Sequence, residues 1–235
     1  MIILLKKFFR SAIIYNMKFK GAIFDLDGTL LDSMHVWDKV DEEYFALLGK
    51  PVPAGYVLAI RDLTMLQAAE YTRRITGVAD SAEEICAKWR EMVADHYAEQ
   101  VQPKRGAAEF LRFLSKSGVK FGIATTLTED IYMPALERLG IAEDFSAKVS
   151  VRDVGKGKGF PDVYLRAAHL MGMDASECVV FEDILKGITS ARSAGFYTVA
   201  VQDASSAADE AALRRSSGMY VKDFTAAALK SLFLP

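Results

Sequence analysis

Apolar residues recur at two different periods along the chain, and this difference divides the chain into regions. Between about Ser33 and Gln100 the apolar positions follow the spacing of amphipathic helices, with breaker residues at 49–55 and 77–80. We therefore expect several helices and no strand in this stretch.

Strand-like runs lie before and after this helical stretch. An apolar run at 20–25 predicts a strand, and after Pro103 short apolar runs alternate with helical segments. A further helix is expected to start within 205–212. The other expected strands are 119–125, 147–151, 177–183 and 196–201, and the expected helices are 106–117, 129–139, 161–171 and one ending at Ala194.

Alternating strands and helices predict an α/β fold with a doubly wound, parallel, Rossmann-like sheet and helices on both faces. The all-helical stretch interrupts this series just after the first strand, so we expect it to be an inserted cap domain. The predicted core consists of residues 18–33 and 103–235, the cap of residues 34–102, and an N-terminal extension of residues 1–17.

The N-terminal extension is apolar but basic. Lys6, Lys7 and Arg10 interrupt its apolar run, which falls short of the roughly 20 residues of a membrane span. No small-residue cleavage site of a secretory signal follows it. We expect an extension without a catalytic role; an extra helix and a membrane-surface patch are the alternatives.

The composition favours a folded enzyme-sized protein over a disordered or nucleic-acid-binding one. The 235 residues are 51% hydrophobic and 26% charged, with a formal net charge of -2. This charge offers no attraction for nucleic acid or an anionic membrane. Cys86 and Cys178 lie far apart in apolar contexts, so we expect free buried thiols and a cytoplasmic location.

Two carboxylates follow the first predicted strand. The run at 20–25 ends in Asp25, Asp27 comes two residues later, and Gly28 permits a sharp turn. Two negative charges this close repel each other unless a cation or a proton lies between them. Mg²⁺ is the simplest such cation, because it prefers oxygen ligands and often binds a substrate phosphate as well.

Other polar residues are expected at the same edge of the sheet, where ligands of open α/β folds bind. Thr125 and Thr126 end one predicted strand, and Glu182 and Asp183 end another. A basic, glycine-rich loop at 155–159 precedes a helix. Carboxylates for a metal, hydroxyls for a phosphate and a lysine for negative charge together indicate phosphoryl transfer.

These segments resemble the four motifs of the haloacid dehalogenase superfamily, in order: DLDGT, the hydroxyl residue after GIA, GKGKxxPD and VVFED. The helical insert resembles the first cap type of that superfamily. The chain is most similar to the β-phosphoglucomutase-like and phosphoglycolate-phosphatase-like hydrolases, from about residue 18 to its end.

The resemblance implies a role for each motif residue. Asp25 would be the nucleophile that forms an aspartyl-phosphate, and Asp27 would be the general acid and base. Thr125, with Thr126 beside it, would bind the phosphoryl oxygens. Lys158 would screen the repulsion between Asp25 and the phosphate.

The resemblance also implies a Mg²⁺ site. Asp25, the backbone carbonyl of Asp27, Glu182 and Asp183 would hold the ion, with Asp183 a direct ligand and Glu182 either a ligand or one layer further out. In the lysine loop, Lys156 is the alternative to Lys158. The loop also departs from the family pattern, because Gly159 stands where the family usually has proline.

Two cap residues are candidates for substrate contact. Arg61 falls where the mutase subgroup carries a cap lysine, so it could hold an anionic or polar group; a surface arginine is the alternative. His35 lies near the expected hinge between cap and core, where a polar structural role is the alternative to catalysis.

Two departures from the mutase subgroup favour hydrolysis. Where that subgroup binds a second phosphate, this chain carries Glu129 and Asp130, and Met65 stands at the position of the mutase's cap arginine. We therefore expect a phosphatase that acts on a small phosphorylated metabolite such as a sugar phosphate. The alternatives are a phosphosugar mutase, a 2-haloacid dehalogenase, and a catalytically silent binding or regulatory protein. A monomer is compatible with the sequence.

Overall fold

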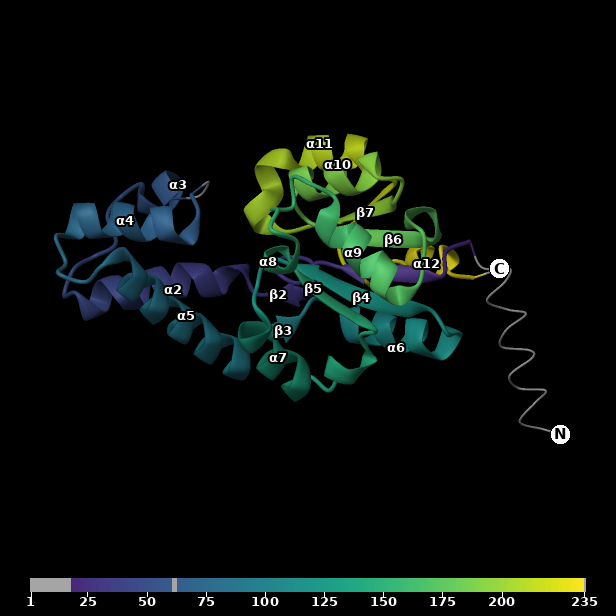
Figure 1. The fold of residues 1–235 in the computed structure, drawn as a ribbon, viewed down its shortest axis with the longest axis horizontal. Coiled ribbons are helices and arrows are strands. Elements are labelled where there is room, and N and C mark those ends of the chain that lie inside the picture. Colours follow the sequence, from purple (N-terminus) through teal and green to yellow (C-terminus); the bar gives the residue numbers. More distant parts are fainter. Residues whose placement is uncertain (1–17, 61–62, 235) are drawn as a thin grey trace.

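A six-stranded parallel sheet forms the centre of the molecule in the computed structural model, which describes residues 18–60 and 63–234 (Figure 1). The order of its strands is β5-β4-β1-β6-β7-β8. The strands are β1 (Gly21–Phe24), β4 (Lys120–Thr125), β5 (Ala147–Ser150), β6 (Cys178–Glu182), β7 (Tyr197–Val201) and β8 (Met219–Val221). Because the chain runs outward from β1 in both directions, the carboxyl end of β1 is the switch point at which such sheets bind ligands.

Helices cover both faces of the sheet. In Figure 1 the helices α6 and α7 lie below it, and α9, α10 and α11 lie above it. These elements are α6 (Ala107–Ser117), α7 (Glu129–Arg138), α8 (Val151–Val154), α9 (Asp162–Met171), α10 (Leu185–Ser193), α11 (Glu210–Ser216) and α12 (Ala227–Ser231), with 3-10 turns at Ala142–Asp144, Ala175–Glu177 and Ala204–Asp209.

Alternate residues of β1 face two different cores. Phe24 lies in an aromatic cluster, stacked on Phe181 at 4.6 Å and edge-on to Phe110 of α6. Ile23 points to the opposite face, among the side chains that α9 and α10 contribute. Both faces being buried explains why this strand is apolar at every position until its carboxyl end.

The cap lies at one end of the sheet (Figure 1), and its described residues form four helices. Capping boxes at Thr64 and Ser81 start two of them, because each hydroxyl accepts a bond from the backbone three residues later. The cap helices are α2 (Met34–Leu47), α3 (Tyr56–Ile60), α4 (Met65–Thr76) and α5 (Ala82–Glu99).

The fold confirms the expected α/β architecture with a helical cap. The two predicted breaks, at 49–55 and 77–80, fall between cap helices, whereas the separation of α3 from α4 is not among the predictions. Among the described residues, three short strands are not among the predictions. The strands β2 (Leu31–Asp32) and β3 (Gln102–Pro103) pair antiparallel where the chain enters and leaves the cap, and β8 extends the sheet. Pieces of two or three residues are too short to show a periodic pattern.

Two further expectations concern local structure. The predicted strand at 147–151 ends at Ser150, whose hydroxyl caps the short helix α8. Cys86 and Cys178 are buried and free, as predicted. The predicted extension, residues 1–17, lies outside the described residues. Among the helices that the structure describes, none is both long and apolar enough to cross a membrane.

Candidate active site

The turn after β1 places Asp25 at the carboxyl edge of the sheet. The backbone N–H of Asp25 still donates to Phe181 O at 3.0 Å, so this residue continues the strand pairing before the chain turns. Gly28 then adopts φ 72°, and a Cβ added there would lie 2.8 Å from Oδ2 of Asp183. Glycine is required by both the left-handed backbone and the close approach of the acid.

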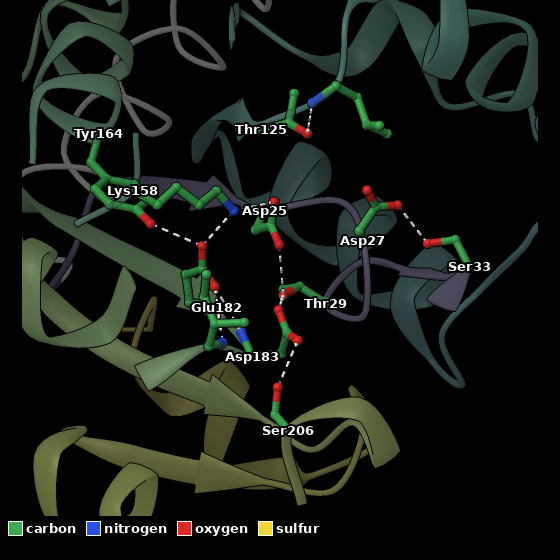
Figure 2. A network of polar contacts seen from close by, with 12 residues as sticks. Asp25, Asp27, Thr29, Ser33, Thr125, Lys158, Tyr164, Glu182, Asp183 and Ser206 are labelled. Atoms are coloured by element: carbon green, nitrogen blue, oxygen red, sulfur yellow. Dashed lines mark hydrogen bonds and ion pairs between the residues drawn. The ribbon is translucent and has the colours of Figure 1, made fainter. Parts of the chain in front are cut away.

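Three carboxylates meet at this edge. Asp25, Glu182 and Asp183 each offer an oxygen, and these atoms lie within 4.8 Å of one another. All three residues are buried. The ammonium of Lys158 contacts Asp25 and lies 2.5 Å from Oε1 of Glu182 (Figure 2). One positive charge therefore faces three acids.

Glu182 is held by four protein donors. Oε1 accepts from Lys158 and from the hydroxyl of Tyr164 at 2.8 Å. Oε2 accepts from the backbone N–H groups of Asp183 and Ile184, at 3.0 and 3.1 Å. Since a carboxylate offers about four lone-pair positions, these donors fill the acceptor capacity of Glu182.

Asp183 is held by hydroxyl groups from two distant segments. Thr29 donates to Oδ1 at 3.0 Å, and Ser206 donates to Oδ2 at 3.2 Å. The Thr29 hydroxyl also lies 3.3 Å from Oδ2 of Asp25, so it links the two acids. Burial, reinforced by the nearby charge of Glu182, raises the pKa of Asp183 to about 7.

The charges of the cluster shift each other's pKa. Burial raises the pKa of Asp25 well above its usual range; Lys158 opposes this shift, and the carboxylates of Glu182 and Asp183 add to it. Burial acts to lower the pKa of Lys158, but Asp25 and Glu182 outweigh it and the pKa is raised. The lysine therefore keeps its charge, while the acids remain an electrostatically costly group that an added cation would stabilise.

Asp27 points away from this cluster, toward the entrance to the cap. Its Oδ1 accepts from Ser33 Oγ at 2.6 Å and from the hydroxyl of Tyr97. Burial raises the pKa of the Asp27 carboxyl, and the hydrogen bonds from Ser33 and Tyr97 act against that rise. The two aspartates of the DLD sequence thus have different environments.

The other predicted phosphate-binding residues differ in burial. Thr125 is fully buried at the end of β4, and its Oγ1 accepts from Leu127 N at 3.1 Å. Thr126 is exposed. Of the two candidate lysines, Lys158 reaches the acids, whereas Lys156 is exposed and pairs with Asp162. Lys158 therefore stays the candidate for contact with the phosphate.

Of the two cap candidates, the structure describes His35, which is not part of the acidic cluster. His35 is exposed in the first turn of α2. Arg61 lies outside the described residues. Glu129 and Asp130 form the exposed first turn of α7, just beyond the end of β4, and Met65 begins α4.

Several residues that hold the site are not among the sequence predictions. Thr29 ends the DLDGT motif and Ser33 follows four residues later, so their closeness to Asp25 in the sequence could have suggested them. Tyr97, Tyr164 and Ser206 come from a cap helix, a core helix and a 3-10 turn. No local pattern marks these three, because only the folded chain brings them to the acids.

The donor set fits a hard divalent cation. Three buried carboxylates with one lysine carry excess negative charge, and oxygen is the ligand that Mg²⁺ prefers. Because Glu182 is already saturated by protein donors, Asp25 and Asp183 are the carboxylates with free lone pairs for a metal.

The fold and the site together define a phosphoryl-transfer type of α/β hydrolase, and a family comparison agrees. The model of the haloacid dehalogenase-like hydrolases matches residues 22–201. This match covers most of the chain, so the protein belongs to that family, and the resemblance inferred from the four motifs is confirmed.

Several named relatives are phosphatases. The chain is 29% identical over 182 residues to validoxylamine A 7'-phosphate phosphatase of Streptomyces hygroscopicus subsp. limoneus, covering 77% of this chain and 84% of the relative. It is 29% identical over 185 residues to hexitol phosphatase A of Escherichia coli, covering 79% and 84%. The expected enzyme class, a phosphoric monoester hydrolase, is the class of these relatives.

A solved structure shows the same fold. CbbY from Rhodobacter sphaeroides, a variant in complex with xylulose-(1,5)bisphosphate, superposes with a TM-score of 0.78 at 20% sequence identity. The match covers 92% of this chain and 100% of that one.

Proposed function

We propose that this protein is a Mg²⁺-dependent phosphatase that hydrolyses a small phosphorylated metabolite through an aspartyl-phosphate. The observation that carries the proposal is the position of Asp25. It is a buried carboxylate at the switch point of the sheet, in contact with Lys158 and within 4.8 Å of two further acids. In its ionised form, which the Lys158 ammonium favours, this carboxylate is itself the nucleophile and needs no separate base.

In the first step, an oxygen of Asp25 attacks phosphorus and the bond from phosphorus to the leaving oxygen breaks. Asp27 gives its proton to that oxygen, so an alcohol leaves. The raised pKa of Asp27 keeps a larger fraction of its carboxyl protonated, as a general acid requires.

In the second step, water attacks the phosphorus of the aspartyl-phosphate. Asp27, now ionised, takes a proton from the water, and the bond from phosphorus to Asp25 breaks. Inorganic phosphate leaves and both aspartates return to their starting states. Asp27 serves as acid and then as base, in line with its position on the cap side of Asp25.

Other residues hold the phosphoryl group and the cation. Lys158 and Thr125, with Thr126 at the exposed rim, contact the phosphoryl oxygens. Asp25, Asp183 and the Asp27 carbonyl would hold Mg²⁺, while Glu182 keeps Lys158 in place. When bound, the ion neutralises charge on the phosphoryl oxygens and reduces their repulsion from Asp25.

The substrate is a phosphorylated carbohydrate or a compound of similar size. The names of the hexitol and validoxylamine phosphatases support this class. Within the cap, Arg61 and His35 are candidates for contact with the leaving group. Glu129 and Asp130 carry negative charge beside the phosphoryl site, which favours a monophosphate over a bisphosphate and hydrolysis over mutase chemistry. The cytoplasmic location stays a prediction.

The test is phosphate release from a panel of phosphorylated metabolites, with Mg²⁺ and after chelation. We expect Mg²⁺-dependent release that falls to background in Asp25→Asn, because an amide cannot attack phosphorus. Acid-quench trapping of a phosphorylated wild-type protein, absent from Asp25→Asn, would support the covalent step. Substantial phosphate release by Asp25→Asn would overturn the mechanism.

Product analysis separates the alternatives. Conversion between sugar 1- and 6-phosphates with little free phosphate would show a mutase, and chloride release from 2-chloropropionate would show a dehalogenase. Binding of phosphorylated metabolites without turnover of any would show a catalytically silent protein.

A further inference from the structure

Tyr97 is a cap residue that reaches into the core. It lies in the last turn of α5, just before the chain leaves the cap, and its side chain is fully buried. Its hydroxyl donates to Oδ1 of Asp27, which is 70 residues earlier in the chain. Among the described residues of α3, α4 and α5, Tyr97 alone forms a hydrogen bond with Asp27.

The core holds the backbone around Tyr97. Arg138, at the end of α7, donates to the carbonyl of Ala98 at 2.6 Å, to that of Val101, and to that of Tyr97 at 3.5 Å. A cation at the carboxyl end of a helix satisfies carbonyls that have no partner within the helix. This clamp fixes the last turn of α5 against the core and so fixes the position of the Tyr97 ring.

Two hydroxyl groups converge on one oxygen of Asp27. Ser33 Oγ lies 2.6 Å from Oδ1, and Tyr97 donates to the same atom. Over residues 18–60 and 63–234, no hydrogen bond reaches Oδ2. Figure 2 shows the Ser33 bond on one side of the carboxylate and the other oxygen turned away from it, toward the side of Asp25 and Thr125. The carboxylate is thus held by one oxygen and leaves the other for proton transfer.

We infer that Tyr97 is a positioning residue for the general acid and base: together with Ser33 it fixes Oδ1 of Asp27, so that Oδ2 faces the leaving oxygen of the substrate. The inference rests on the proposed phosphatase function. A phenol ordinarily has a pKa of about 10, so near neutral pH the Tyr97 hydroxyl keeps its proton and is a donor. Ser33 alone would leave the carboxylate free to rotate about a single contact.

Tyr97→Phe tests this inference with two classes of substrate. An alkyl phosphate needs a proton on its leaving oxygen, whereas p-nitrophenyl phosphate has a leaving group that is stable as an anion. Because kcat/KM reports the step in which the leaving group departs, we expect it to fall about 10-fold or more for the alkyl phosphate. For p-nitrophenyl phosphate we expect it to stay within about 3-fold of wild type.

Tyr44→Phe is the matched control. Tyr44 is also a buried cap tyrosine, but its hydroxyl has no hydrogen-bond partner among the described residues. This variant removes the same atom without touching Asp27, and we expect wild-type kcat/KM for both substrates.

The outcomes are distinct. If kcat/KM of Tyr97→Phe falls equally for both substrates, or does not fall for either, the inference is overturned. If wild type turns over neither substrate class, the proposed function fails and the inference with it. Should Tyr97→Phe not fold, Arg138→Met carries the test, because it releases the clamp and leaves the hydroxyl in place. A selective loss on the alkyl phosphate then supports the inference, and an equal loss or none overturns it.

Discussion

The ammonium of Lys158 lies 2.5 Å from Oε1 of Glu182, an oxygen that also accepts a hydrogen bond from Tyr164. The same ammonium contacts Asp25, so one cation joins the proposed nucleophile to an acid whose oxygens are all occupied by protein donors. Glu182 is therefore best placed to orient Lys158.

Lys158→Met should remove both activity and stability. It leaves buried carboxylates without their cation, and breaking a buried ion pair in this way costs roughly 3–5 kcal/mol. We expect a free energy of unfolding lower by about that amount in urea and phosphate release near background. Lys156→Met is the control in the same loop: its exposed pair with Asp162 should contribute at most about 1 kcal/mol. Equal losses in the two variants would contradict the assignment of Lys158.

The sequence predicts the parts of the site that sit at strand ends. Asp25, Thr125, Glu182 and Asp183 each follow an apolar run, and the carboxyl ends of parallel strands meet at one edge. Burial on both faces makes these runs recognisable, so a strand end can be located to within a residue or two. The cap is predictable for a similar reason, because its long helices repeat their apolar positions over several turns.

The supporting residues could not be predicted in this way. Tyr97 and Ser206 reach the site because of how α5 and the turn after β7 pack, and no periodic pattern specifies that packing. The strands β2 and β3 are two residues each. They pair because the segments that enter and leave the cap lie side by side. The local sequence shows which residues end a strand. Long-range packing decides which side chains form hydrogen bonds with those residues.

Gly28→Ala should damage the metal site more than the fold. The left-handed backbone costs roughly 1–2 kcal/mol for a residue with a Cβ, and this Cβ would lie 2.8 Å from Oδ2 of Asp183. We expect Asp183 to be displaced and the affinity for Mg²⁺, measured by isothermal titration calorimetry, to fall by about 10-fold or more.

Gly49→Ala is the matched control for Gly28→Ala. Gly49 has φ 64°, close to the 72° of Gly28, but a Cβ there would meet nothing within 4 Å. This variant should show the backbone cost in urea unfolding and keep wild-type Mg²⁺ affinity. Unchanged Mg²⁺ affinity in Gly28→Ala would refute the proposed role of Asp183 in holding the ion.

Ser206→Ala should weaken the metal site without removing a ligand. Its hydroxyl donates to Oδ2 of Asp183 at 3.2 Å, and groups that orient a ligand typically contribute about 10- to 100-fold to metal affinity. We expect the Mg²⁺ affinity to fall by about 10-fold, since Thr29 still donates to Oδ1 of Asp183. Ser231→Ala removes an exposed hydroxyl that bonds its own helix and serves as the control. A Ser206→Ala protein with the Mg²⁺ affinity of this control would contradict the role assigned to Ser206.

Asp41 should make the stability of the protein depend on pH. Burial in the cap, aided by the charge of Asp38, raises its pKa from 3.8 to about 7, while a hydrogen bond from Tyr56 opposes the rise. Between these two values the folded protein keeps a proton that the unfolded chain has released. The contribution of Asp41 to the free energy of unfolding is therefore largest below about pH 4. It decreases as the pH rises toward 7 and does not change further above that pH.

Asp41→Asn removes this dependence, because an amide does not ionise. Urea unfolding at pH 5 and pH 8 should show that the free energy of unfolding of Asp41→Asn exceeds that of wild type by more at pH 8 than at pH 5. Glu42→Gln, which removes a carboxylate from an exposed neighbour on the same helix, should keep the wild-type difference between the two pH values. If Asp41→Asn raised the free energy of unfolding equally at both pH values, Asp41 would be ionised in the folded protein throughout this range. Burial would then not raise its pKa to about 7.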